Sequence, residues 1–416
     1  MPFRRSAGVL ALIVAGAVTR VASAQTPPAA SPPAQGQPLT LQTALTRALE
    51  ANPTIIAARF RRNVGEANLA VAGQHLNPEL TYEAEKETPR QAIGASFPIE
   101  FGGKRGRRMD LARAGVDAAN ADIEATIAEV RSDVRRAYYE LAAAAERVTM
   151  AEGTRALAAR MRDAADARFT AGDVPRLDAV QTALVFLDAD NEVTAAGGEL
   201  AGARAELNAL LGQPLDTPIL AADTMTLLPV PSATDAIARA ATTNAELVAL
   251  DRHIAEQVAR RDLARTLRTP DASAGGSVTY DAQPEFSVGW RVSFGFTLPL
   301  FTQHHEEFAL EDAELSRLRA ERAARASAIA GAVASAVARA SAARAQVARF
   351  QAEILPRAVD VEQMAQDGYA AGQTSLSVLL QALQSARDTR RRGLEAALAF
   401  QLALADLERA IGAPLQ

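Results

Sequence analysis

Two kinds of hydrophobic pattern alternate along the chain. From Thr40 to about Leu76, and again from Ser232 to about Leu267, small and apolar residues recur at helical spacing. Two later stretches change to a period of two, in which Leu80 and Tyr82 alternate with polar residues and the run from Trp290 to Leu300 alternates throughout. The sequence therefore predicts helices interrupted by short strands that have one apolar and one polar face.

Each pair of strands is followed by a long helical pattern, from about Gly103 to Thr170 and from about Gln303 to Ala370, broken only at Pro356. A helix of this length is about 100 Å long at roughly 1.5 Å per residue, which is deeper than any globular core. Both patterns end at a glycine, Gly172 or Gly372, that can stop a helix. Shorter helices return over residues 175–211 and 374–411, and we expect each to stack end to end with the helix that precedes the strands.

The two halves of the chain align as an internal repeat. Pro78 matches Pro270 at an offset of 192, Pro98 matches Pro299 at 201, and Gly172 matches Gly372 at 200. Because the offset changes by nine residues between the first two matches and by only one between the next two, nearly all of the length difference lies in the strand hairpin. The predicted boundaries are a signal peptide at 1–24, a proline-rich linker at 25–38, and repeats at 39–215 and 232–415, with hairpins at 79–101 and 272–301.

The N-terminus has the three parts of a cleavable secretory signal: Arg4 and Arg5, an apolar stretch from Ala7 to Val18, and the small residues Ala22-Ser23-Ala24. The chain has no cysteine, which excludes disulfides, thiolate metal sites and lipidation on cysteine. A net charge of −5 without a basic face disfavours nucleic acid as a partner. No later segment has eighteen uncharged apolar residues in a row, so we predict no transmembrane helix and expect strands to make any membrane contact.

Each half offers only two strands, so the four-strand sheet has edges that need partners. A soluble sandwich gives the same alternation, but so few strands cannot cover helices of this length. A membrane barrel completed by other copies of the chain fits better, since single-chain barrels need at least about eight strands. The predicted lipid-facing side chains are Tyr82, Phe97, Trp290, Phe294 and Phe296. The predicted lumen-facing side chains are Glu83, Glu85, Glu100 and Arg291.

The motifs in their order carry a family resemblance. The hairpin exits Phe97-Pro98-Ile99-Glu100-Phe101-Gly102-Gly103-Lys104-Arg105 and Thr297-Leu298-Pro299-Leu300-Phe301, with the glycine-containing helix ends, resemble the TolC-type outer-membrane efflux proteins. The Gly-Gly-Lys-Arg exit is most similar to the CzcC-like, heavy-metal-efflux branch.

The resemblance covers residues 39–415 and implies a mainly α fold with a small transmembrane β part. Three copies would form one 12-stranded β-barrel, four strands from each protomer, continued by a trimeric α-barrel through the periplasm. It further implies an outer-membrane channel of a tripartite efflux system that conducts heavy-metal cations or drugs. The implied partners are a periplasmic adaptor (a membrane fusion protein) and an inner-membrane pump of the resistance-nodulation-division (RND) type.

In the family, acidic residues shortly after the second tip glycine line a periplasmic gate. The matching positions here are Val378 and Gln381, so the acidic pair is missing, whereas the first repeat has Asp178 six residues after Gly172. We expect a gate of Asp178, Val378, Leu379 and Gln381, although Asp178 fits a solvated helix-surface charge equally well. The tip residues expected to contact the adaptor are Arg168, Phe169, Gly172, Asp173, Tyr369 and Gly372.

Other chemistry is weakly represented. The sequence has no phosphate-binding loop, nucleophile elbow or HExxH motif, and it predicts no enzyme and no cofactor. His304 and His305 are adjacent without a third ligand, so we expect no metal site. The basic cluster of Lys104, Arg105, Arg107 and Arg108 is typical of a solvated face, but at the periplasmic rim of a membrane strand it also fits an anchor to headgroups or the lumen wall. The alternative function is a soluble periplasmic coiled-coil adaptor or scaffold, which needs no lipid-facing strands.

Overall fold

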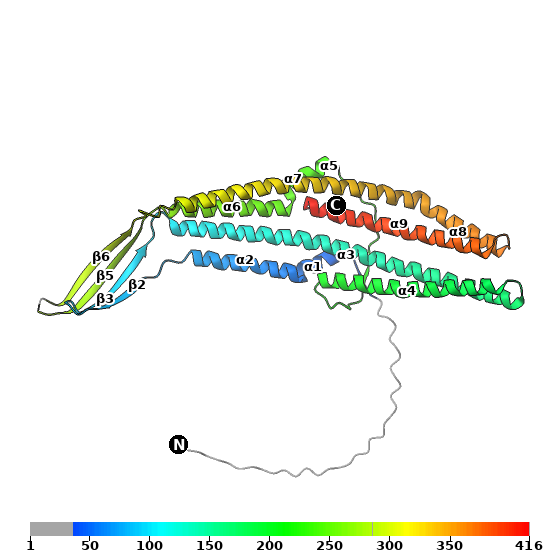
Figure 1. The fold of residues 1–416 in the computed structure, drawn as a ribbon, viewed down its shortest axis with the longest axis horizontal. Coiled ribbons are helices and arrows are strands. Elements are labelled where there is room, and N and C mark those ends of the chain that lie inside the picture. Colours follow the sequence, from blue (N-terminus) through cyan, green and yellow to red (C-terminus); the bar gives the residue numbers. More distant parts are fainter. Residues whose placement is uncertain (1–35, 285, 416) are drawn as a thin grey trace, which may run out of the picture. The chain divides into compact units, whose positions relative to one another are not determined.

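The computed structural model describes residues 36–284 and 286–415, and the predicted signal peptide and most of the predicted linker lie outside them. These residues form a long body with a β-sheet at one end and two helical hairpin tips at the other (Figure 1). In chain order the elements are β1 (Gln37–Leu39), α1 (Leu41–Ala51), α2 (Pro53–Ala72), β2 (Glu79–Ala84), β3 (Gln91–Ile99), α3 (Lys104–Ala171), α4 (Arg176–Leu210), β4 (Ile219–Ala221), α5 (Ala233–Thr243), α6 (Ala245–Thr266), β5 (Asp271–Ala282), β6 (Phe286–Thr297), α7 (His305–Arg349), a π-helical turn (Phe350–Ile354), α8 (Leu355–Ala370) and α9 (Leu376–Ile411).

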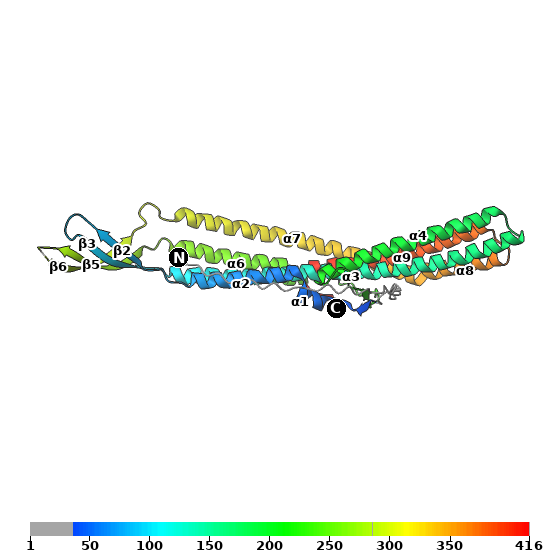
Figure 2. The ribbon, with the colours of Figure 1, turned by 90° about the horizontal axis from the view of Figure 1, so that it is seen from below.

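The long helices lie side by side in one layer. In the half next to the sheet the order across the layer is α2, α3, α6 and α7, and toward the tips it is α4, α3, α9 and α8 (Figure 1). Figure 2 shows α1 on one side of the long helices at mid-length. The layer therefore has two open margins, one formed by α2 and α4 and the other by α7 and α8.

Each helix that precedes a hairpin is split in two at an asparagine, a division that the sequence analysis missed. Asn52 ends α1 and caps α2, accepting from the N–H groups of Thr54 and Ile55 at 2.9 and 3.2 Å. Its amide nitrogen donates to the carbonyl of Leu210, at the end of the return helix α4, at 2.8 Å. Asn244 makes the same contacts in the second repeat and donates to Ala410 at 2.9 Å.

The asparagine joints require glycine in the neighbouring turn. Gly212 has a φ of 65°, and a Cβ on it would lie 2.4 Å from the carbonyl oxygen of Ala51. Gly412 has a φ of 80°, and its Cβ would lie 2.5 Å from the carbonyl oxygen of Thr243. Only glycine accepts both the left-handed backbone and the close approach. Each return helix thus ends where the pre-hairpin helix is jointed.

The two long helical stretches differ. The first, α3, runs without interruption for 68 residues. The second is interrupted by a π-helical turn at Phe350–Ile354, immediately before Pro356. Proline has no N–H to continue the helical ladder and its ring crowds the preceding turn, which explains an irregularity just upstream. The predicted break at Pro356 is therefore displaced by a few residues.

Each repeat has its own core at mid-length. In the first, Leu39, Val134, Tyr138, Leu207 and Ile219 are buried between α1, α3, α4 and the parallel pair β1–β4. In the second, residues of α5, α7 and α9 are buried around Phe400 and Leu404. The Tyr138 hydroxyl donates to the carbonyl of Leu39 at 2.9 Å and accepts from the N–H groups of Ala222 and Asp223 at 3.1 and 3.0 Å.

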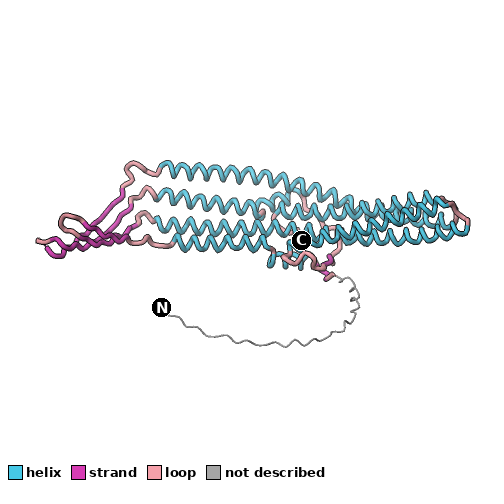
Figure 3. The backbone as a smooth tube through the Cα atoms, turned by 60° about the horizontal axis from the view of Figure 1, so that its bottom comes forward, coloured by secondary structure: helices cyan, strands magenta, loops and turns pink. Residues whose placement is uncertain are grey.

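The sheet is antiparallel throughout, with strand order β2-β3-β5-β6, so β2 and β6 are its edges. Figure 3 shows the strands, in magenta, at one end of the body. The loops joining β2 to β3 and β5 to β6 lie at the end of the body remote from the helices. The two repeats meet in the middle of the sheet, where β3 pairs with β5.

One helical stretch among the described residues, His305–Ala370, is long and apolar enough to cross a membrane by length and composition alone. The sequence analysis predicted none, because it required eighteen uncharged apolar residues in a row. Only 28% of the apolar window is buried within the chain. Because the helix packs along α6 and α9, this window is an exposed side of a helix in the layer.

Candidate functional site

The two faces of the sheet have different chemistry. The register aligns Tyr82, Ile93, Val278 and Trp290 in one row across the four strands, so their side chains share a face. Neighbouring rows on that face carry Phe97 with Phe294, and Ile99 with Phe296. The side chains predicted to face lipid all lie on this face, where Trp290 is 81% exposed.

The opposite face is polar and lined by small residues. One of its rows joins Thr81, Gly94, Ser277 and Arg291, and the next joins Glu83, Ala92, Thr279 and Gly289. Of the four predicted lumen residues, only Glu83 and Arg291 lie in strands on this face. Glu85 lies beyond β2 in the hairpin loop, where its N–H donates to the carbonyl of Arg90 at 2.9 Å.

Glu100 was predicted to line the lumen, but in the structure it lies after the end of β3 and is bound by an arginine of α3. It follows β3, outside the strand, and its carboxylate accepts two hydrogen bonds from the guanidinium of Arg108, one of them 3.0 Å long. These hydrogen bonds hold the pKa of Glu100 below its usual value. The alternation of β3 does not continue into the turn, and Glu100 joins the strand exit to α3 instead of lining the sheet.

Two basic side chains after the first strand hairpin, Lys104 and Arg105, donate hydrogen bonds within the chain. Lys104 is 8% exposed at its side chain and donates to the carbonyl of Thr269 at 2.9 Å and to Asp271 at 2.7 Å. Arg105 donates to the carbonyl of Gly73 at 2.7 Å. These contacts tie α3 to both neighbouring connections, α2–β2 and α6–β5. Lys104 is therefore held inside the chain, whereas Arg105 and Arg108 have internal partners but stay half-buried.

At the far end of the body, each hairpin turns at a left-handed glycine. Gly172 and Gly372 have φ values of 84° and 71°, and open space surrounds the position of a Cβ on either one. The predicted contact residues Phe169, Asp173 and Tyr369 lie in or next to these turns, and the guanidinium carbon of Arg168 lies 5.7 Å from the centroid of the Tyr369 ring. The two tips of one chain are therefore in direct contact.

The four predicted gate residues differ in accessibility. Asp178 lies in the first turn of α4 and is half-buried, and its N–H donates to the carbonyl of Pro175 at 3.1 Å. A carboxylate at this position also stabilises the helix N-terminus. Val378 and Gln381 are exposed on α9, but Leu379 is only 3% exposed. Leu379 packs within its own chain and is not available to line an aperture.

Above the tips, the α3–α4 hairpin and the α8–α9 hairpin enclose a cavity of about 780 Å³. Arg387 of α9 reaches across to Glu192 of α4 at 2.9 Å, and Arg390 pairs with Glu362 of α8. The walls include Leu157 and Leu383. None of the predicted gate residues lines this cavity, and no sequence pattern had indicated the ion pair between the hairpins.

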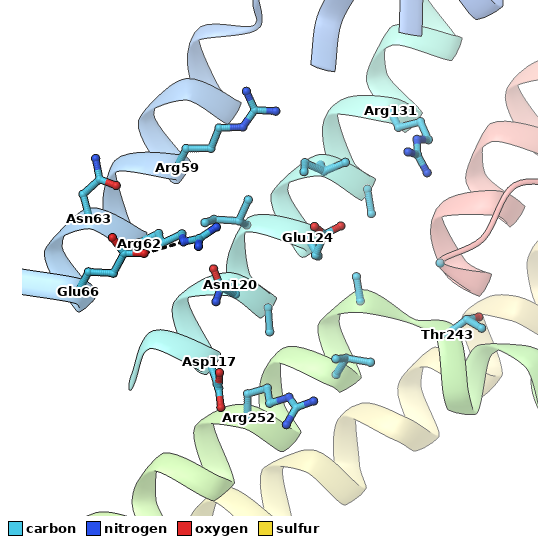
Figure 4. A pocket seen from close by; sticks show the side chains of 17 residues that line it. Arg59, Arg62, Asn63, Glu66, Asp117, Asn120, Glu124, Arg131, Thr243 and Arg252 are labelled. Carbon is cyan, nitrogen blue, oxygen red and sulfur yellow. Dashed lines mark hydrogen bonds and ion pairs between the residues drawn. The ribbon is translucent and has the colours of Figure 1, made fainter. Parts of the chain in front are cut away.

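A larger groove, about 1110 Å³, runs over α2, α3 and α6 (Figure 4). Arginines from all three helices line it, together with carboxylates and amides. In the figure the labelled side chains of Arg59, Arg131 and Arg252 lie apart on their separate helices, and Arg62 pairs with Glu66 at 2.9 Å. The groove is an open polar surface without a converging cluster.

Three histidines, His253, His304 and His305, each lie within hydrogen-bond distance of a charged side chain. His304 lies 3.1 Å from Glu307, His305 lies 3.0 Å from Arg268, and His253 lies 3.0 Å from Asp122. Among the described ranges, no group of three or more histidine, aspartate and glutamate side chains is arranged to hold a metal ion.

A family profile and a curated relative match this chain, and both concern efflux or metal resistance. Residues 44–213 match the sequence profile of the family described as "Outer membrane efflux protein". The cobalt-zinc-cadmium resistance protein CzcC of Cupriavidus metallidurans is 26% identical over 363 residues, 86% of this chain and 86% of CzcC.

Solved structures agree in fold. The CmeC outer membrane channel of Campylobacter jejuni superposes with a TM-score of 0.75 at 17% identity, over 89% of this chain and 85% of that chain. CusC, whose structures concern folding and transmembrane channel formation, superposes with a TM-score of 0.74 at 18% identity, over 91% of this chain and 93% of that chain.

Proposed function

Because this chain belongs to the outer membrane efflux protein family, we propose that it forms the outer-membrane channel of a tripartite efflux system. In this proposal the sheet lies in the outer membrane and the helical body extends into the periplasm. Solutes pass from the helical tips to the cell exterior.

The sheet is the observation that carries the proposal. It has one continuous apolar face with exposed aromatic side chains and one polar face, and within the described residues each edge strand is paired on one side only. Unpaired strand edges cannot remain within a bilayer, so such a sheet must close into a barrel. Three copies supply 3 × 4 = 12 strands, which is within the size range of membrane barrels.

The margins of the helix layer support a head-to-tail ring. At one margin, α2 exposes Phe60, Val64 and Val71, and α4 exposes a similar row that includes Leu184. At the opposite margin, α7 exposes small residues at helical spacing: Ala313, Ala320, Ala324 and Gly331. This second margin also exposes Leu310 of α7 and Met364 of α8. Apolar side chains on two different margins suit a heterologous contact, which forms a ring when its rotation closes. This contact would cover the apolar window of α7.

For the gate, we propose a ring of three Asp178 carboxylates with Val378 and Gln381 at the periplasmic entrance. Asp178 and Val378 follow the two tip glycines by the same six residues, so they would alternate around a closed trimer. The adaptor would meet the tips at Arg168, Phe169, Gly172, Asp173, Tyr369 and Gly372. An inner-membrane pump of the RND type would deliver the substrate.

Divalent metal cations are the substrate class that we propose. The support is the similarity to CzcC, a cobalt-zinc-cadmium resistance protein, over most of both chains. A carboxylate at the entrance and Glu83 on the polar face of the sheet would favour cations over anions. A soluble adaptor or scaffold is disfavoured, since it would leave a continuous row of tyrosine, isoleucine, valine and tryptophan exposed to water.

Channel recordings test this function. The purified protein should run as a heat-modifiable trimer and conduct ions in planar bilayers, and Asp178→Ala should lower its cation-to-anion permeability ratio. Gln381→Ala, at an uncharged position of the same entrance, is the matched control and should leave the ratio unchanged. Detergent-free solubility without conductance would contradict the channel. A conducting trimer whose selectivity is unaffected by Asp178→Ala would remove only the gate assignment.

A further inference from the structure

The loop that leaves the edge strand β6 is the most exposed apolar segment of the described residues. Phe301 is 100% exposed, and Leu298 and Leu300 beside it are also exposed. The loop is held in shape by a hydrogen bond from the N–H of Leu300 to the carbonyl of Leu298 at 2.9 Å. Beneath it lies a small groove of about 290 Å³, lined in part by Leu267 and Thr269. An ordered loop with uncovered apolar side chains indicates a missing partner.

The first repeat shows how the same position is satisfied inside the chain. Position 301 corresponds to position 100, since 301 − 100 = 201, the offset of the two hairpin exits. There the side chain is Glu100, only 15% exposed and bound by Arg108. Its strand, β3, has neighbours on both sides, whereas β6 has a neighbour only on the side of β5. The exposed side chain, Phe301, therefore follows the edge strand β6, whereas the half-buried one, Glu100, follows the interior strand β3.

The register of the sheet indicates what lies at this level on the opposite edge. One row joins Glu79 of β2, Ser96, Gly275 and Ser293 of β6. Four residues from that row toward the helices, β6 ends at Thr297 and the opposite margin reaches His75. By the same count, Leu298 is level with residue 74 and Phe301 with residue 71, on a margin where Val71 and, a few residues nearer the sheet, Leu76 are exposed.

We propose that Phe301 is the central apolar contact between one copy of this chain and the next. Its ring, with Leu298 and Leu300, packs on Val71 and Leu76 of the adjacent copy, at the junction of sheet and helices. This inference rests on the proposed function, because it requires the β6 edge of one copy to lie beside the β2 edge of another. A lipid could cover the apolar side chains, but it cannot pair the backbone of the edge strand from which they extend.

Disulfide cross-linking tests the contact directly, since the chain has no native cysteine. The double variant Phe301→Cys/Leu76→Cys should form bonds between copies on mild oxidation and give dimer and trimer bands. Phe301→Cys/Val71→Cys serves as a companion, because barrel stagger shifts the contact by a few residues. Within one chain the two edges are about 14 Å apart, from three strand spacings of about 4.8 Å, which exceeds the reach of a disulfide.

A matched control is available in the first repeat. Phe101 is an exposed aromatic residue at the exit of the interior strand β3. The double variant Phe101→Cys/Leu76→Cys can bond within one chain, because β2 and β3 are neighbouring strands, and it should stay a monomer band on oxidation. Phe301→Asp should lower the fraction of heat-modifiable trimer by about tenfold or more, as expected for a buried aromatic anchor, and Phe301→Leu should largely retain the trimer.

The outcomes separate this proposal from the channel itself. Conducting trimers that give neither cross-link and tolerate Phe301→Asp would overturn the Phe301 contact and leave the channel standing. Wild-type protein that forms no oligomer would overturn both. A dye on Phe301→Cys that is quenched by spin-labelled lipid would assign the loop to the bilayer, again against the proposed contact.

Discussion

The two repeats follow the same plan of elements, but their hairpin exits have opposite chemistry. In the first, two left-handed glycines lead directly into α3, and Lys104 and Glu100 are bound by groups of the same chain. In the second, the exit is an apolar loop with Phe301 fully exposed. The first exit follows an interior strand and the second an edge strand. Equivalent positions of the two repeats therefore differ according to whether the strand before them is paired on one side or on both.

Their long helices differ in a related way. In the first repeat α3 is continuous. Two of its arginines contact α4: Arg162 lies 4.2 Å from the ring centroid of Phe186, and Arg155 pairs with Asp190 at 2.6 Å. The second contains the π-helical turn, and Gly393 of α9 leaves room for Leu355 beside it, where a Cβ would lie 3.3 Å from that side chain. By contrast, the asparagine joints at Asn52 and Asn244 are the same in both repeats. The joint between each return helix and the split helix before its hairpin is therefore the same in both repeats, whereas the contacts along the long helices are not.

Removing one hydroxyl from the first core should have the largest effect on stability. Tyr138 is buried, which raises its pKa to about 12, and it bonds the β1–β4 layer to α3. The corresponding position of the second repeat is Ala338, which has no such group. Tyr138→Phe leaves buried backbone groups unpaired and should lower the free energy of unfolding by about 2 kcal/mol. Urea unfolding followed by circular dichroism measures this difference.

Tyr369→Phe is the control for that measurement, because it removes a tyrosine hydroxyl at an exposed tip of the second repeat. Its change in unfolding free energy should stay within about 0.5 kcal/mol. Equal effects of the two substitutions would mean that the layer does not depend on the hydroxyl of Tyr138.

The ion pair at the first exit should give a smaller effect that depends on pH. The pKa of Glu100 is held below its usual value of 4.5 by its hydrogen bonds to Arg108, so ionised Glu100 stabilises the folded chain above about that pH. This stabilisation is lost as the pH falls through the lower, folded-state pKa. Glu100→Gln should therefore cost about 1.5 kcal/mol at pH 7, and the difference from wild type should shrink below pH 4.5.

Glu66→Gln, which breaks the exposed pair with Arg62, is the control for Glu100→Gln. Exposed pairs contribute little, so its loss should stay below about 0.5 kcal/mol at either pH. A pH-independent difference between wild type and Glu100→Gln would show that the carboxylate charge does not hold the exit.

Periodicity in the sequence was sufficient for the helices, the strands and the two faces of the sheet. The side chains of Tyr82 and Trp290 lie on the predicted face because a strand repeats every two residues, however distant its partners are. Periodicity gave no warning at Glu100, where the strand ends one residue earlier, or at Leu379, which a tertiary contact buries. The cap at Asn52 had a local signal, the following Pro53, which the long helical pattern obscured.

The contact between the tips should give the smallest effect, because it is exposed. Arg168 lies over the ring of Tyr369, and a surface cation–π pair contributes about 0.5 to 1 kcal/mol. Arg168→Ala should therefore speed hydrogen exchange in the turns at residues 168–176 and 368–376 by about two- to fivefold, without changing exchange at mid-length. Tyr369→Ala should do the same, and the double variant should add little. Tyr369→Phe keeps the ring and should exchange like wild type. Additive effects of the two alanine substitutions would mean that the tips of one chain open independently, and then only contacts between chains could hold the entrance closed.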